Sequence, residues 1–324
     1  MVDIQQIADL IDAKVLGKKD DKISDLSSFK SSTNSSICVV FGRKYFKDAI
    51  NSKCGSIVVS NKDTEIHNIK KNILIVHDVR YSMFLLSKFF KSQSEKHYCP
   101  KSNSLNISES AVIEKNVNIG LNCNIGHNAV IESGVTLGNN VYIDSNVVIH
   151  RGVIVGDSVS IFSGTVIGSE GFGNIKNNQN KWLHIDHLGS VVIGSNVRIG
   201  ANCTIDRGTL DDTIIQDGVI LDNSVHIAHN VIIGSDTAIA AKVGIAGSSK
   251  IGKRNLIGGM VGIIDHITTV DDVTISATST VSRNINKPGV YTGIMPISQH
   301  ASWRRLAFWF TKLDKIVKHI NFKN

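Results

Sequence analysis

An aliphatic residue returns at every sixth position over most of the chain beyond residue 110. A small or β-branched residue stands two positions before nearly all of them, with Asn255 before Ile257 as the exception. A six-residue period sustained over so many copies predicts a repeat architecture. The aliphatic positions are Ile113, Ile119, Ile125, Ile131, Leu137, Ile143, Ile149, Val155, Ile161, Ile167, Ile193, Ile199, Ile205, Ile215, Leu221, Ile227, Ile233, Ile239, Ile245, Ile251, Ile257, Ile263, Ile275 and Val281.

Each hexad predicts a short strand and a turn, and three hexads predict one triangular coil. The aliphatic residue points inward and stacks on its equivalent in the next coil, because one coil alone cannot bury a core. Gly, Asn and Asp follow the strands, where the chain needs a tight or left-handed backbone. The pattern is typical of a mainly β fold, the left-handed parallel β-helix, which we predict over residues 101–285.

Two segments interrupt the hexads. Residues 168–190 are too long for a corner, and residues 206–212 (DRGTLDD) add about one turn. Protruding loops contribute nothing to a regular solenoid, so we expect these two to carry function or a subunit contact.

Residues 1–100 have a different pattern, which predicts a small α/β domain. Helical spacing appears in IQQIADLIDA and RYSMFLLSKFFKS, and short apolar runs at 35–42, 55–60 and 72–78 predict strands. A polar stretch around Pro100 predicts a linker to the β-helix.

Residues 286–324 predict a C-terminal helical extension with one apolar stripe. Such a face packs against a neighbouring subunit or, with its basic flanks, binds an acidic partner. The stripe is Leu306, Phe310, Leu313, Val317 and Ile320, and the basic residues around it are Arg304, Arg305, Lys312, Lys315 and Lys318.

The composition is globular, with 42% hydrophobic and 19% charged residues. A formal net charge of +7 favours an acidic partner. The chain has no zinc-finger or RNP-type motif and no arginine-rich arm, so we expect no nucleic-acid partner.

The five cysteines include no C-x-x-C pair, which predicts buried free thiols in a reducing compartment. No signal peptide is recognisable, and no apolar run approaches the roughly 18–20 residues that span a bilayer. We expect a cytoplasmic protein, a location that is compatible with work at the inner-membrane surface.

The stretch NSVHIAHNVIIG holds His226 and His229 at H-x-x-H spacing. Strand alternation points His226 outward because it precedes the inward Ile227, whereas His229 falls at the corner. The two side chains need not converge, and no Cys or Glu cluster joins them. We therefore expect no metal site here. His127 has the same hexad position as His229, so this position alone does not make a histidine catalytic.

Acyl transfer requires a neutral imidazole as base, backbone N–H donors for the oxyanion and a groove for both substrates. His229 is the candidate base, and Gly247 offers an N–H that a carbonyl can approach closely. His266 lies 37 residues after His229, or about two coils, so we expect both histidines on one side of the solenoid.

Several motifs resemble the UDP-3-O-acylglucosamine N-acyltransferase family of lipid A biosynthesis. They are the GFG loop, TIDRG, DDTIIQDG, IAHN, AGSSKIGKRNLIGG, KPGVY and WRR, which together cover nearly all of the β-helix and the C-terminal helix. Residues 1–100 resemble the uridine-binding domain of that family more loosely.

The resemblance implies roles for individual residues. His229 matches the general base that deprotonates the glucosamine 2-amine, and Gly247 matches the oxyanion donor. His266 matches a histidine that contacts the substrates, while Asp222 and Asn223 match neighbours of the base.

Further substrate contacts follow from the same resemblance. Tyr45 matches an aromatic residue that stacks on uracil, with Lys44 beside it, and Phe172 of the GFG loop is a substrate-binding candidate. The implied donor is 3-hydroxyacyl acyl carrier protein, which itself carries the phosphopantetheine, so the enzyme needs no cofactor. The implied acceptor is UDP-3-O-acylglucosamine, and the implied assembly is a homotrimer with sites between neighbouring β-helices.

The sequence departs from the family at GRKY (42–45), where N-P-K-Y is common, and at LHIDHLG (183–189), where a K-I-P-Q-like run is common. Three alternatives stay open at this point. They are the related UDP-GlcNAc O-acyltransferase, a zinc lyase like the γ-type carbonic anhydrase, and a solenoid scaffold without catalysis.

Overall fold

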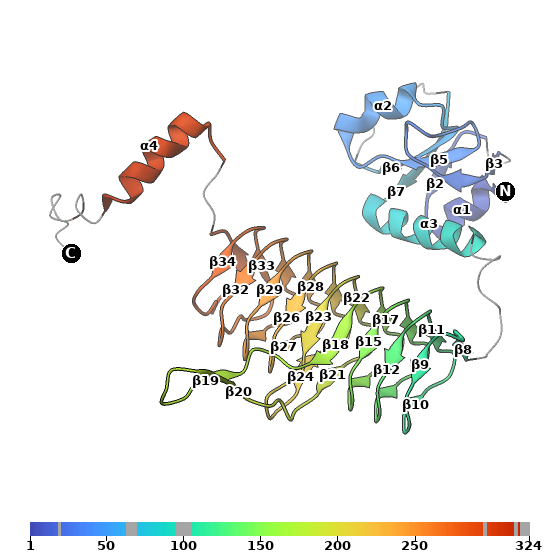
Figure 1. Cartoon of the computed structure of the whole chain (residues 1–324). Coiled ribbons are helices and arrows are strands. Elements are labelled where there is room, and N and C mark those ends of the chain that lie inside the picture. Colours follow the sequence, from blue (N-terminus) through green and yellow to red (C-terminus); the bar gives the residue numbers. More distant parts are fainter. Residues whose placement is uncertain (19–20, 63–69, 95–104, 294–296, 314–316, 318–324) are drawn as a thin grey trace. The chain divides into compact units, whose positions relative to one another are not determined.

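The computed structural model describes residues 1–18, 21–62, 70–94, 105–293, 297–313 and 317 (Figure 1). Contacts divide the chain into two units, Met1–Lys101 and Ser102–Asn324. The linker predicted around Pro100 lies outside the described residues, as do Cys99 and the helix positions Lys315, Lys318 and Ile320.

The first unit is a five-stranded sheet in the order β2-β7-β6-β5-β4, in which only the β2–β7 pair is antiparallel. The predicted helices and strands of residues 1–94 are all present. The elements are β1 (Val2–Asp3), α1 (Ile4–Leu10), β2 (Lys14–Leu16), β3 (Lys22–Ile23), β4 (Asp25–Leu26), β5 (Ser36–Val39), η1 (Arg43–Tyr45), α2 (Phe46–Asn51), β6 (Ser56–Ser60), β7 (Asn72–Val76) and α3 (Val79–Ser94).

The central strands of this sheet are apolar on both faces, because helices cover both. One core contains Val58 and Leu74 with residues of α1 and α3, such as Ile7 and Leu86. The other contains Val59 with Ala49 of α2.

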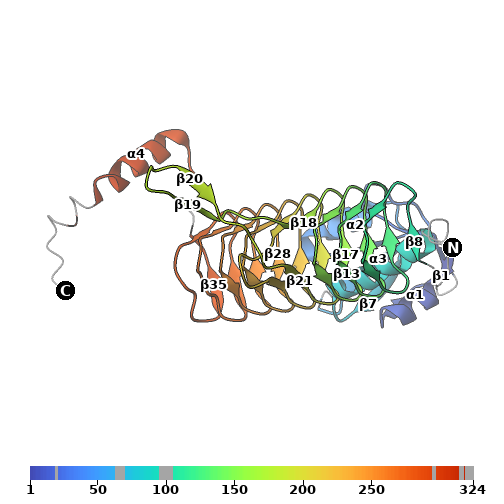
Figure 2. The same ribbon diagram turned by 60° about the horizontal axis from the view of Figure 1, so that its bottom comes forward.

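The second unit is a parallel β-helix with three sheets, which confirms the predicted fold class (Figures 1 and 2). Face I contains β10 (Asn118–Ile119), β13 (Thr136–Leu137), β16 (Ile154–Val155), β21 (Val191–Ile193), β24 (Thr213–Ile215), β27 (Ile232–Ile233) and β30 (Lys250–Ile251). Face II contains β8 (Asn106–Ile107), β11 (Asn124–Ile125), β14 (Tyr142–Ile143), β17 (Ser160–Ile161), β22 (Arg198–Ile199), β25 (Ile220–Leu221), β28 (Ala238–Ile239), β31 (Leu256–Ile257), β33 (Val273–Ile275) and β35 (Gly289–Tyr291). Face III contains β9 (Val112–Ile113), β12 (Val130–Ile131), β15 (Val148–Ile149), β18 (Val166–Ser169), β23 (Thr204–Asp206), β26 (His226–Ile227), β29 (Gly244–Ile245), β32 (Gly262–Ile263) and β34 (Thr280–Val281).

The aliphatic residue of each hexad faces the interior, as predicted. Ile131 pairs with Ile149, and Ile149 pairs with Ile167, so that equivalent side chains stack one coil apart. Ile149 has no exposed surface. The residue two positions earlier, such as Val147, is buried in the same core.

The third residue after the inward aliphatic adopts a left-handed backbone. Asn146 has a φ of 59°, and Asn side chains are tolerated there because they bond locally. Lys242, Met260 and His266 occupy the same corner position with φ values of 61°, 60° and 57°.

Both interruptions leave the stack intact. Ile161 pairs with Ile199 across the first, and Arg198 pairs with Ile220 across the second. The first contains a hairpin of β19 (Asn174–Lys176) and β20 (Trp182–His184), which protrudes from the coils (Figure 2).

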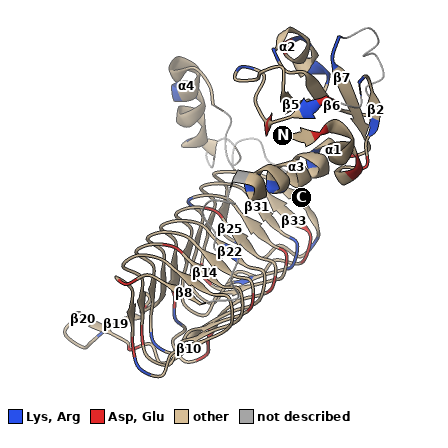
Figure 3. Ribbon diagram, turned by 90° about the vertical axis from the view of Figure 1, so that its right-hand side faces the viewer, with Lys and Arg blue, Asp and Glu red and all other residues tan. Residues whose placement is uncertain are grey.

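Helix α4 spans His300–Phe310, and Leu306, Phe310, Leu313 and Val317 of the predicted stripe are exposed. Within the described residues, no helix is both long and apolar enough to cross a lipid bilayer. Charges of both signs lie along the edges of the coils (Figure 3). The predicted buried free thiols are confirmed for Cys38, Cys54, Cys123 and Cys203.

We expect Ile149→Ala to lower the free energy of unfolding by about 2–5 kcal/mol, because it removes buried methyl groups and leaves a cavity. Ile154→Ala is the matched control, since Ile154 points outward and is 46% exposed. Urea unfolding of both variants measures the difference. Equal losses would contradict the assignment of inward and outward positions.

Candidate functional site

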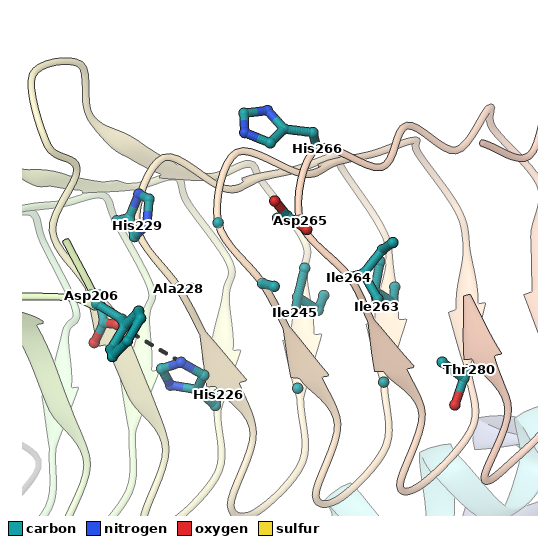
Figure 4. Close-up of a pocket in the computed structure, with 15 residues that line it drawn as sticks. Asp206, His226, Ala228, His229, Ile245, Ile263, Ile264, Asp265, His266 and Thr280 are labelled. Atoms are coloured by element: carbon teal, nitrogen blue, oxygen red, sulfur yellow. Dashed lines mark ion pairs between the residues drawn. The ribbon is translucent and has the colours of Figure 1, made fainter. Parts of the chain in front are cut away.

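A groove of about 700 Å³ runs along face III, over β23, β26, β29, β32 and β34 (Figure 4). Glycine occupies the outward position of β29 and of β32. A Cβ added at Gly244 or Gly262 would meet nothing within 4 Å, so these positions leave the floor open. The residues that line the groove are Phe172, Asp206, His226, Ala228, His229, Gly244, Ile245, Ala246, Gly247, Gly262, Ile263, Ile264, Asp265, His266 and Thr280.

His229 is held in one tautomer by its neighbour. The Asn230 side-chain amide is oriented by two backbone groups, since Thr209 N–H donates to Oδ1 at 3.0 Å and Nδ2 donates to Asp211 O at 2.7 Å. His229 Nδ1 lies 3.0 Å from Asn230 Oδ1. Because this oxygen only accepts, Nδ1 carries the proton, and in the neutral ring the lone pair is on Nε2.

The Nε2 atom of His229 faces Gly247. A Cβ added at Gly247 would lie 2.6 Å from Nε2, so only glycine leaves room for this ring. Within the described chain, the Gly247 N–H makes no backbone hydrogen bond, whereas Ser248 N–H donates to His229 O at 3.0 Å. A basic nitrogen and a spare N–H donor therefore lie side by side at the groove.

A buried carboxylate lies beside the histidines. Asp206 is 7% exposed and accepts a hydrogen bond from Ser169 Oγ at 3.1 Å. Burial raises the pKa of this carboxyl, against the opposing effect of His226 and His229. His226 Nε2 lies 3.8 Å from Asp206 Oδ2 (Figure 4), and His226 Nδ1 lies 2.7 Å from Thr204 Oγ1.

The first interruption forms one wall of the groove. Its Phe172 is 80% exposed on the lining, and its His187 is buried with its ring 5.4 Å from that of His229. Arg207 anchors the end of the interruption, because its Nε donates to Gly189 O at 2.8 Å. The two expected functional loops thus both contribute to this region.

His229 and His266 lie on one side of the solenoid, as expected, because both line this groove. Ile227, Ile245 and Ile263 pair in adjacent coils, so the residues two positions later, His229, Gly247 and Asp265, form one row. His266 is one residue further on, at the left-handed corner, and lies at the rim of the groove (Figure 4). The spacing of 37 residues exceeds two coils by one residue, and that residue moves the side chain off the row.

Comparisons with known proteins identify the family. A model of the hexapeptide repeat of succinyl-transferase matches residues 116–151. The chain is 54% identical to the UDP-3-O-acylglucosamine N-acyltransferase of Ruthia magnifica subsp. Calyptogena magnifica, over 100% of this chain and 98% of that protein. The chain belongs to the UDP-3-O-acylglucosamine N-acyltransferase family. It is 55% identical to a second member, from Vesicomyosocius okutanii subsp. Calyptogena okutanii, over 98% of this chain and 96% of that protein.

This membership makes the protein an acyltransferase, as its motifs predicted. Solved structures of UDP-N-acetylglucosamine acyltransferases share the fold. The one from Campylobacter jejuni has a TM-score of 0.53 at 24% identity, covering 64% of this chain and 84% of that chain. The one from Bacteroides fragilis has a TM-score of 0.52 at 27% identity, and the match covers 62% of this chain and 77% of that chain.

The structure separates Asp222 and Asn223 from His229 within one chain. They follow β25 on face II, in a hollow of about 270 Å³ with Arg198 and Phe162, whereas His229 follows β26 on face III. One hexad turns the chain to the next face, so residues six or seven positions before His229 cannot lie beside it. Within one chain, Asp222 and Asn223 therefore do not neighbour His229.

Tyr45 and Lys44 lie in the first unit, on η1. Tyr45 is 36% exposed, and Lys44 Nζ lies 4.8 Å from the centroid of its ring. Phe41, close by in the sequence, is 49% exposed. A partly exposed aromatic ring with an ammonium group close to it offers stacking area and positive charge, which suit a flat, anionic ligand.

Sequence reasoning missed Asp206 and His187. Both would be exposed on a bare solenoid or loop, and each is buried only because the first interruption folds back over the coil. The signal available in the sequence was their position, since Asp206 is the first residue of the second interruption and His187 lies near the end of the first.

We expect Asp206→Asn to stabilise the protein at pH 7. The folded-state pKa of Asp206 is raised above its ordinary value of 3.8, so the parent protein loses stability as the pH rises through that pKa. Asn has the same shape without the charge. Unfolding measured from pH 3 to pH 8 should show an advantage that disappears below about pH 4. A variant that is less stable than the parent at pH 7 would instead mean that the attraction to His226 exceeds the cost of burial.

Proposed function

We propose that the protein transfers a 3-hydroxyacyl chain from acyl carrier protein to the 2-amine of UDP-3-O-acylglucosamine, in lipid A biosynthesis. The observation that carries this proposal is the free Nε2 of His229 directly beside Gly247 on the lining of an open groove. The names of the full-length relatives support the acceptor.

The proposed reaction uses His229 as general base. The 2-amine attacks the thioester carbonyl while His229 Nε2 accepts the amine proton. The Nδ1–H bond to Asn230 orients the ring throughout, and the nearby Asp206 favours the imidazolium when it carries a negative charge. Gly247 N–H donates to the tetrahedral oxyanion. Collapse of the intermediate forms the amide and releases the phosphopantetheine thiolate, which takes the proton from His229.

We place Phe172 and His266 at the substrates, because both line the groove with His229. In the first unit, residues 1–100, Tyr45 stacks on uracil beside Lys44, so that this unit is a uridine-nucleotide-binding domain. The protein binds no cofactor of its own, because the donor carries the pantetheine.

We further propose a cytoplasmic homotrimer. Face II exposes large apolar side chains at outward positions, namely Tyr142, Ile220 and Leu256, and such a surface favours a subunit contact. Packing of face II near the groove of a neighbouring chain explains how Asp222 and Asn223 serve a site from which they are separated in their own chain. The basic residues of α4 suit an acidic carrier protein.

We expect His229→Ala to lower kcat by about 10²–10⁴-fold, because the base is lost and the fold is kept. His127→Ala is the control, since His127 has the same hexad position but follows face II, with its Nδ1 2.6 Å from Ser108 Oγ. The assay uses 3-hydroxyacyl carrier protein with the O-acylated and the unacylated sugar nucleotide. Near-parental activity of His229→Ala contradicts the assigned base. Transfer to the unacylated sugar alone supports the related O-acyltransferase.

We expect Gly247→Ala to lower kcat by about 10²-fold or more, because the added methyl group displaces His229 and obstructs the approach of the oxyanion to the retained N–H. The added Cβ would fall 2.6 Å from His229 Nε2, and Asn230 keeps the ring from moving freely. Gly244→Ala adds a methyl group in the same groove without a contact within 4 Å, and should cost much less. Equal losses in the two variants would argue against a specific role for Gly247.

A further inference from the structure

Three potential metal ligands meet at the root of the hairpin, outside the groove. They are Glu170 before β19, His184 at the end of β20, and Asp186 two residues later. One ligand atom from each lies within 4.8 Å of the other two, and His184 Nε2 is 2.7 Å from Glu170 Oε2. In the part of the chain that the structure describes, no other three His, Cys, Asp or Glu residues meet in this way.

The local structure explains why these three residues meet. Asn174 and His184 are partners in the antiparallel hairpin, so His184 lies at its root, close to the segment that enters it. Asp186 is two residues from His184, and this spacing puts both side chains on one side of an extended chain.

The electrostatics suit a cation. Glu170 and Asp186 each offer a carboxylate oxygen, and His184 offers a ring nitrogen. All three residues are exposed, and an exposed ion pair contributes little on its own. The ion pair between Glu170 and His184 does not include Asp186, whereas a metal ion would bind all three side chains.

A buried histidine, His187, lies next to the cluster and packs against His184. His187 Nδ1 lies 2.9 Å from Ile185 O, so Nδ1 carries the proton. Its Nε2 is buried and has no hydrogen-bond partner among the described residues. The ring stacks on that of His184 at 5.8 Å and meets that of His229 at 5.4 Å. A buried acceptor without a partner is costly. This nitrogen lies on the side of Gly173 and is not one of the three clustered ligand atoms, so His187 contributes to the cluster only by stacking its ring on that of His184.

We propose that Glu170, His184 and Asp186 bind one divalent transition-metal ion, with Zn²⁺ preferred. Tetrahedral Zn²⁺ with bonds of about 2.0–2.2 Å needs ligand atoms about 3.3–3.5 Å apart, which small rotations of exposed side chains achieve. The ion replaces the proton between His184 Nε2 and Glu170 Oε2, and water fills the fourth position. The imidazole ligand favours Zn²⁺ over Mn²⁺ and Mg²⁺, which prefer all-oxygen ligand sets.

The ion would tie the segment that enters the hairpin to the segment that leaves it. Those segments carry Phe172 on the groove lining and His187 against the candidate base. The ion thus steadies the wall around His229 and takes no part in the chemistry. The site does not depend on the proposed acyl transfer, because its test is metal binding itself.

The experiment titrates ZnCl₂ into the chelator-stripped full chain by calorimetry, with Co²⁺ absorption as a second measurement. We expect one ion to bind per chain. Its affinity should fall by at least about 100-fold in His184→Ala, and by at least about 10-fold in Glu170→Gln and in Asp186→Asn. His150→Ala is the matched control, because His150 pairs with Glu132 at 3.0 Å without a third ligand, and should bind like the parent. Circular dichroism checks that each variant is folded.

A replacement ligand separates coordination from ion pairing. Glu170→His removes the ion pair but supplies a nitrogen ligand, so it should keep Zn²⁺ binding. Equal affinity in the parent and His184→Ala overturns the proposal, since other histidines then hold the ion. Binding too weak to detect at about 1 mM Zn²⁺ overturns it as well.

Discussion

The stacking of one aliphatic side chain per hexad is the constraint on which the rest of the structure depends. It fixes the register between coils, because a shift of one residue would turn the inward set toward water. Once the inward residues are stacked, every other hexad position forms its own row along the solenoid, with neighbours about 4.8 Å apart. The candidate site is built on such a row, where His229 and Gly247 come from hexads that are distant in sequence yet adjacent in space.

The groove has two causes. Outward side chains are absent at the glycines of its floor, and the first interruption of the hexads adds a segment that forms its wall. Glycine at positions 244 and 262 removes outward side chains from the floor, and glycine at 247 gives room to the imidazole. The first interruption then builds a wall and buries Asp206 and His187, which a bare solenoid would leave in water. A uniform scaffold thereby gains a polar, partly enclosed environment at one place along its length.

Much of this could be predicted from the sequence, since the hexads specify the three-sided β-helix and the inward residues almost one by one. The position of His229 at a corner also follows from the period. The period could not place Asp206 or His187, because their burial depends on how a non-repetitive segment folds back. It did not assign Asp222 and Asn223 either, because their expected place near the base came from the resemblance to the family. Asp222 and Asn223 are one hexad from His229 and so lie on another face, and His266 misses the row by one residue.

The coils under the groove differ in rigidity from one end to the other, because each coil of a solenoid contacts only its two neighbours. His229 follows β26, with several coils stacked on either side, whereas Thr280 belongs to β34, the last strand of face III. Terminal coils open more readily than internal ones. A long ligand lying in the groove would therefore meet a rigid end at His229 and a more deformable end at Thr280, so that the groove could adapt to the far end of the ligand without moving the histidine.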